Sequence, residues 1–151
     1  MSLQIPADLL AQIRAHGKAA YPEEGAGFLL GRANGEQRVL VSILPAENRR
    51  EDSARHKRYL LGPQQLCQAE ETAQRLGLDL IGVFHSHPNH PAQPSAFDRD
   101  WALPWFSYVI TRVDQGQAIA SRSWRLAEDR QDFVEESIVE VNEAISEKAN
   151  N

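Results

Sequence analysis

Two histidines and an aspartate stand close together in the sequence, at a spacing that suits a metal ion. His85 and His87 are separated by one residue, and Asp98 follows in the same segment. Imidazole nitrogen and carboxylate oxygen are ligands that a catalytic zinc ion prefers, and three protein ligands leave a fourth position open for water. The sequence therefore predicts one Zn²⁺ ion per chain, bound by His85, His87 and Asp98.

The segment before these histidines has the pattern of a buried strand. Residues 78–84 read Leu-Asp-Leu-Ile-Gly-Val-Phe, which is mostly apolar and rich in strand-forming side chains. Positions i and i+2 of a strand point to the same face of a sheet. His85 and His87 can therefore approach the same ion from the end of this strand.

A proline-rich stretch, residues 88–94, separates the histidines from Asp98. Pro91 and Pro94 stiffen it, which lowers the entropy cost of holding the ligands together. We expect this stretch to turn the chain so that Asp98 becomes the third ligand. Ser95 is expected to begin a short helical turn, because serine is a favoured N-cap residue.

These residues resemble the motif of a known family, the JAMM (MPN+) zinc metalloproteases. That motif is a glutamate, a long gap, His-Ser/Thr-His, a spacer, and Ser-x-x-Asp. Its positions are filled here by Glu24, His85, Ser86, His87, Ser95 and Asp98. Residues 21–31 also look like the family's Pro-x-Glu-x-Cys-Gly-x-x-x-Gly segment, although Gly25 and Ala26 stand where many members carry Ala and Cys. The likeness covers roughly residues 5–127.

The resemblance implies metal-assisted hydrolysis of an amide. Glu24 would act as a general base toward water and then as a general acid toward the leaving amine. Ser95 would donate a hydrogen bond to the oxyanion of the tetrahedral intermediate. Ser86 and Pro88 are expected to support the loop; in particular, no base is evident that would make Ser86 a nucleophile. His90 is interpreted as a solvent-exposed turn residue.

The family likeness also implies a substrate class, proteins with a ubiquitin-like fold. Eukaryotic relatives cut isopeptide bonds, and stand-alone prokaryotic relatives act on the C-terminal tails of ubiquitin-fold sulfur-carrier proteins. This chain lacks the long insertions of the eukaryotic enzymes, which favours the sulfur-carrier branch and tail trimming. The oligomeric state stays open, with a homo-oligomer as one possibility.

Two other interpretations of the same sequence remain. One is a non-catalytic MPN scaffold, although scaffold members usually lose ligands and this chain keeps them. The other is the DNA-repair-associated branch of the fold, whose loop reads His-Asn-His-Pro-Ser-Gly. Ser86, the pair Asn89-His90 and the net charge of −5 argue against that branch, because nucleic-acid binding needs a basic surface.

Length and composition are typical of one soluble globular domain of 151 residues. Long apolar runs and a secretion signal are absent, and Cys67 is the single cysteine, so a cytoplasmic protein is expected. We expect Cys67 to be a small packing residue. Residues 1–127 are expected to form the catalytic domain, and the acidic residues 128–151 an amphipathic helix that packs on it.

Hydrophobic periodicity predicts the remaining elements. Helices are expected over 6–20 and 63–76, and strands over 25–32, 39–44, 107–113 and 117–126. The C-terminal helix is inferred from the stripe Val134, Ile138, Val141 and Ile145. The order of elements indicates an α/β or α+β domain with a mixed sheet flanked by helices. The resemblance implies the three-layer, cytidine-deaminase-like MPN fold. The charged stretch from Arg49 to Arg58 is interpreted as a solvated loop, and a basic rim that contacts an acidic partner is the alternative.

Overall fold

The computed structural model describes residues 1–46, 61–129 and 131–142. This part of the chain contains seven strands and three helices. In chain order they are β1 (Ser2–Pro6), α1 (Ala7–Ala20), β2 (Ala26–Asn34), β3 (Gln37–Ala46), α2 (Pro63–Arg75), β4 (Asp79–Pro88), α3 (Ala96–Trp101), β5 (Ser107–Asp114), β6 (Gln117–Leu126) and β7 (Phe133–Val141). The predicted Arg49–Arg58 loop lies outside the described residues.

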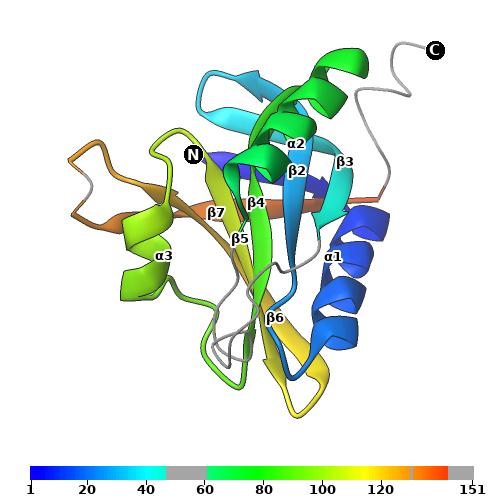
Figure 1. The fold of residues 1–151 in the computed structure, drawn as a ribbon, viewed down its shortest axis with the longest axis vertical. Coiled ribbons are helices and arrows are strands. Elements are labelled where there is room, and N and C mark those ends of the chain that lie inside the picture. Colours follow the sequence, from blue (N-terminus) through cyan, green and yellow to red (C-terminus); the bar gives the residue numbers. More distant parts are fainter. Residues whose placement is uncertain (47–60, 130, 143–151) are drawn as a thin grey trace.

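The strands form a closed ring in the order β1-β3-β2-β4-β5-β6-β7, with β7 returning to β1 (Figure 1). β4 runs parallel to β5, and β1 runs parallel to both β3 and β7. The other neighbours are antiparallel. The mixed sheet with flanking helices confirms the α+β class, whereas the three-layer arrangement and the likeness to cytidine deaminases stay predictions.

Two apolar cores lie on opposite faces of the central strands, because side chains alternate along a strand. On β2, Leu29 belongs to the core beneath α1, whereas Phe28 and Leu30 belong to the core beneath α2. Figure 1 shows α2 crossing in front of the upper part of β2 and β4, with α1 along the right side of the sheet. β2 and β4 are thus covered on both faces, which explains their nearly continuous apolar sequences.

Most elements expected from the sequence are confirmed. α1 and α2 match the two predicted N-terminal helices, and β5 and β6 match the predicted pair of strands. The hairpin signalled by Asn34-Gly35 is present: Gly35, with a φ of 64°, and Glu36 form the tight connection, and Asn34 is the last residue of β2 and pairs with Gln37 of β3. Gly77 follows α2 with a φ of 68°, a backbone conformation that glycine adopts without steric cost.

The predicted C-terminal amphipathic helix is wrong for residues 133–141, which form strand β7. The predicted apolar stripe includes Val134, which is 48% exposed, whereas Glu136, outside the stripe, is 2% exposed. The segment is rich in β-branched side chains, and it pairs with β1 and β6, which stabilises an extended conformation over a helix. Ile145, the last member of the stripe, lies outside the described residues.

The packing of α2 differs from the expectation at Cys67. Cys67 is exposed, so its expected role as a packing residue is wrong. Leu76 follows the helix and is 54% exposed, whereas Ala69 and Ala73 are buried. The helix buries a narrow stripe of small residues against β2 and β4, and Cys67 lies to one side of it.

No helix within residues 1–46, 61–129 and 131–142 has both the length and the apolar character that crossing a membrane requires.

Candidate metal centre and active site

The end of β4 carries both candidate histidines. The strand continues through His85, Ser86 and His87 to Pro88, four residues further than the apolar run suggested. β2 pairs with it on one side, placing Ala26 opposite His85, and β5 pairs with it on the other. Both histidines are buried, with exposed fractions of 1% for His85 and 6% for His87, so their rings contact protein atoms and not solvent.

The start of α3 holds the candidate aspartate through a reciprocal cap. The backbone N–H of Asp98 donates to Ser95 Oγ at 3.1 Å, and the backbone N–H of Ser95 donates to Asp98 Oδ2 at 2.8 Å. This arrangement is a capping box, which satisfies the first N–H groups of the helix and restrains the carboxylate at the same time. The predicted N-cap role of Ser95 is confirmed.

The three side chains meet at one point. His85 Nε2 lies 3.2 Å from His87 Nε2 and 3.3 Å from Asp98 Oδ1, and His87 Nε2 lies 3.2 Å from Asp98 Oδ2. Zinc binds nitrogen and oxygen ligands at about 2.0–2.1 Å in a tetrahedron, whose corners are then about 3.3 Å apart. These residues, called the metal cluster below, therefore fit a metal ion of this size.

The ring of His87 is oriented by a backbone carbonyl. His87 Nδ1 lies 2.9 Å from Pro91 O, and a carbonyl oxygen only accepts hydrogen bonds. The proton of the neutral ring is therefore on Nδ1, and the lone pair of Nε2 faces His85 and Asp98. Sequence reasoning assigned Pro91 only a stiffening role, because every residue has a carbonyl and the sequence does not indicate which one is used.

Burial and mutual charge set the protonation of the metal cluster. Burial lowers the pKa of His85, while the neighbouring Asp98 opposes the shift. Burial raises the pKa of Asp98, but interactions with His85 and then His87 outweigh it and hold that pKa below its usual range. Neutral imidazole and ionised carboxylate are the forms that bind metal ions.

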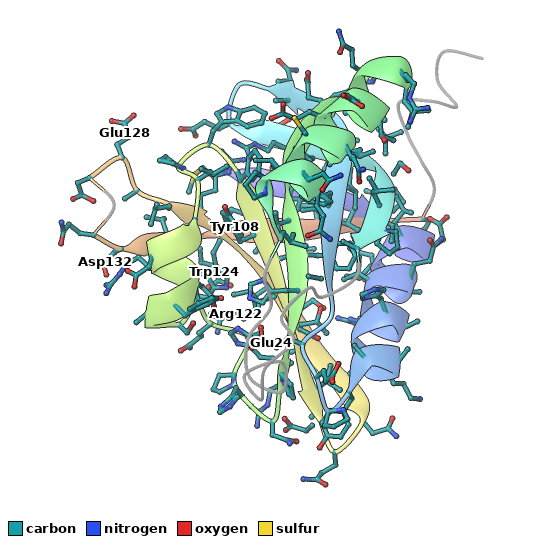
Figure 2. The ribbon with its side chains drawn as sticks, viewed as in Figure 1. Glu24, Tyr108, Arg122, Trp124, Glu128 and Asp132 are labelled. Carbon is teal, nitrogen blue, oxygen red and sulfur yellow. The ribbon has the colours of Figure 1, made fainter. Side chains whose placement is uncertain are left out.

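Glu24 lies at the same end of the sheet, just before β2 (Figure 2). Its side chain is 5% exposed. Together with His87, Ser95 and Asp98 it lines a cavity of about 400 Å³. The structure thus brings the predicted glutamate and serine to the same cavity as two of the predicted metal ligands, His87 and Asp98. His90 is exposed, as expected, and also lines the cavity.

Ser86 connects the two segments that carry these groups. Its buried Oγ accepts a hydrogen bond from the backbone N–H of Gly25 at 2.8 Å, and its own backbone N–H donates to Gly25 O at 3.0 Å. Gly25 directly follows Glu24, so Ser86 restrains the glutamate against β4. This contact agrees with the supporting role that the sequence predicted.

The chain belongs to a family described as prokaryotic homologs of the JAB domain, whose family model matches residues 6–127. It is 35% identical, over 74% of its own length and 71% of the relative's, to a probable TtuB-protein conjugate cleaving protease of Thermus thermophilus. It is also 29% identical to a desampylase of Haloferax volcanii, over 74% of this chain and 81% of that one.

Solved structures of other proteins share the fold. A Salinibacter ruber protein is 44% identical to this chain, with a TM-score of 0.72 and coverage of 92% of both chains. A JAB1/MPN domain protein of Archaeoglobus fulgidus has a TM-score of 0.56 at 20% identity, covering 90% of this chain and 98% of its own. The second likeness shows the fold alone.

Proposed function

We propose that this protein is a zinc-dependent protease that hydrolyses an amide bond at the C-terminus of a ubiquitin-fold protein. The observation that carries the proposal is the metal cluster, whose ligand atoms lie 3.2–3.3 Å apart beside a cavity that Glu24 also lines. When bound, zinc acts as a Lewis acid and lowers the pKa of water toward neutrality.

The chain's own residues would then divide the remaining work. Glu24 accepts the proton of the attacking water and delivers it to the leaving amine, which a buried carboxylate in the cavity wall can do. The Ser95 hydroxyl accepts from Asp98 N–H, so its own proton is available for the oxyanion of the tetrahedral intermediate. Ser86 and Pro88 hold the end of β4 in place.

The names of the relatives support this substrate class. The Thermus protein is named for cleaving conjugates of TtuB, and the Haloferax protein is named a desampylase. The first name favours a bond between a modifier and another protein. Trimming of a sulfur-carrier tail, which the sequence favoured, uses the same chemistry and stays a prediction, as do the cytoplasmic location and a homo-oligomer.

The test compares two neighbouring glutamates. Zinc content and cleavage of a ubiquitin-fold protein carrying either a C-terminal peptide extension or an isopeptide-linked lysine peptide would be measured by mass spectrometry. Wild type and the control Glu23→Gln should cut one or both substrates. Glu24→Gln should retain zinc and lose cutting by at least about 10²-fold, the usual contribution of general acid–base catalysis.

Each other outcome has a distinct meaning. Full activity of Glu24→Gln, or activity that survives chelation, contradicts the mechanism. Stoichiometric zinc without cutting of either substrate contradicts the substrate class and leaves the metal centre in place. Absence of zinc and of cutting in the wild type favours the non-catalytic scaffold.

A further inference from the structure

The segment between β4 and α3, residues 89–94, carries the carbonyl that orients His87. Asn89 is fixed at its start, where its backbone N–H donates to Val113 O at 2.8 Å. Ser95 is fixed at its end by the cap of α3. Most side chains between these points are exposed, but Ala92 is 4% exposed. Ala92 is therefore where the middle of the segment is anchored to the body of the protein.

The anchor is a tryptophan from a distant strand. The indole Nε1–H of Trp124, on β6, donates to Ala92 O at 3.0 Å. Trp124 and Ala92 are 32 residues apart in the sequence. The next carbonyl back along the chain is that of Pro91, which accepts from His87 Nδ1. Because peptide units are rigid, fixing one carbonyl restricts the position of its neighbour.

Trp124 is itself held from two sides. Its backbone pairs with Tyr108 on β5 and Glu135 on β7. The guanidinium of Arg122 lies 5.1 Å from the centre of its ring, and Arg122 also donates to both carboxylate oxygens of Glu135 at 2.8 and 2.6 Å. Figure 2 shows Trp124 and Arg122 between α3 and the strands of the sheet. The indole is thus a rigid donor.

We propose that Trp124 is a positioning residue for the metal centre, acting through Ala92 and Pro91 to hold His87 with its lone pair toward the ion. The proposal rests on the proposed function, since His87 serves as a metal ligand there. Groups that hydrogen-bond a metal ligand typically contribute 10- to 100-fold to metal affinity. Trp124 acts one peptide unit further away, so we expect about a tenfold effect.

The test removes the donor and keeps the aromatic ring. Trp124→Phe should raise the zinc dissociation constant about tenfold in a chelator-competition titration. It should also change the visible absorption spectrum of the Co²⁺-loaded protein, which reports ligand geometry. The matched control is Trp105→Phe. Like Trp124, Trp105 stacks with an arginine, since Arg38 Cζ lies 4.3 Å from the centre of its ring. Trp105 is however 49% exposed and is not among the residues that line the cavity. Its zinc affinity should equal that of wild type.

A second readout needs no metal. In the metal-free protein, ¹⁵N NMR of the histidine rings at alkaline pH should find the His87 proton on Nδ1 in wild type and Trp105→Phe, and a mixture of tautomers in Trp124→Phe. If Trp124→Phe unfolds the protein, the same measurements use a variant that carries a tryptophan analogue at position 124. This analogue has sulfur in place of the ring N–H, so it keeps the shape of the side chain and lacks the donor. Unchanged zinc affinity together with an unchanged tautomer overturns the proposal. A wild type that binds no zinc contradicts the proposed function, and the tautomer comparison still decides the role of Trp124.

Discussion

Two buried polar clusters lie beside the same strand, β4, and they are built on opposite principles. The metal cluster comprises His85 and His87 at the end of β4 and Asp98 on α3. The second, here called the ion cluster, comprises Arg38, Arg125 and Glu136 and lies beside Ile81. In the metal cluster the facing atoms are imidazole nitrogens and carboxylate oxygens, all within 4.8 Å of one another. In the ion cluster, cationic donors face an anionic acceptor.

The ion cluster is completed by the protein itself. Arg38 donates to Ile81 O at 3.1 Å and to Ser107 Oγ at 2.9 Å, and its guanidinium stacks on Trp105. Arg125 forms an ion pair with Glu136, which also accepts from Ser123 Oγ at 2.8 Å. Burial and then Arg125 lower the pKa of Arg38 to about 10, against the opposing effect of Glu136. Arg38 is therefore charged at neutral pH.

The difference teaches how to separate a structural cluster from a functional one. Buried charges that serve stability are matched by opposite charges and hydrogen bonds across several strands. The metal cluster instead brings lone pairs together, an arrangement that gains most of its stabilisation when a cation is added. It also lies beside an open cavity, whereas the ion cluster connects β3, β4, β5, β6 and β7.

The largest effect on folding is expected from the ion cluster. Glu136→Gln keeps the size of the side chain but leaves the largely buried Arg125 without its ion-pair partner and removes the nearby anion that favours the charged form of Arg38. We expect the free energy of unfolding to fall by about 3–5 kcal/mol, as when one partner of a buried ion pair is removed. Urea unfolding of the metal-free protein measures it. A loss below about 1 kcal/mol would contradict the distinction between the clusters.

The metal cluster should respond to zinc instead. At a free zinc concentration about 100 times the dissociation constant, the wild type should gain about 2.7 kcal/mol in stability, because the ion binds the folded state. Asp98→Asn should bind zinc weakly, gain little stability, and lose cleavage. Calorimetric unfolding with and without zinc measures both proteins. Equal zinc stabilisation of Asp98→Asn and wild type would exclude Asp98 as a ligand.

The smallest effect on the free energy of unfolding is expected at Glu135, the residue before Glu136. Glu135 makes an ion pair with Arg122 at the protein surface, where both side chains are about 40% exposed. Exposed ion pairs contribute about 0–1 kcal/mol. Glu135→Gln should therefore change the free energy of unfolding by less than about 1 kcal/mol in the same urea experiment. A loss equal to that of Glu136→Gln would mean that burial is not what distinguishes the two glutamates.

Local patterns predicted the elements that depend on neighbouring residues. The apolar run before His85, the Asn34-Gly35 turn and the serine cap at residue 95 each carry a local physical signal. The C-terminal strand carries a misleading local signal, because Val134, Ile138 and Val141 are spaced four and three residues apart, which fits a helix and not the two-residue period of a strand. The pairing of β7 with β1 and β6 overrides this signal, and β1 lies at the other end of the chain.

The sequence by itself predicted the chemistry of the candidate site: residue type and spacing indicate His85, His87 and Asp98, and the family resemblance adds Glu24 and Ser95. Tertiary structure decided which backbone groups orient them. The Pro91 carbonyl, the Gly25 N–H and the Trp124 indole act through contacts between residues far apart in the chain or through backbone atoms. Backbone groups are common to nearly all residue types, and the Trp124 indole reaches a carbonyl 32 residues away, so which of these groups meet depends on how the strands pack.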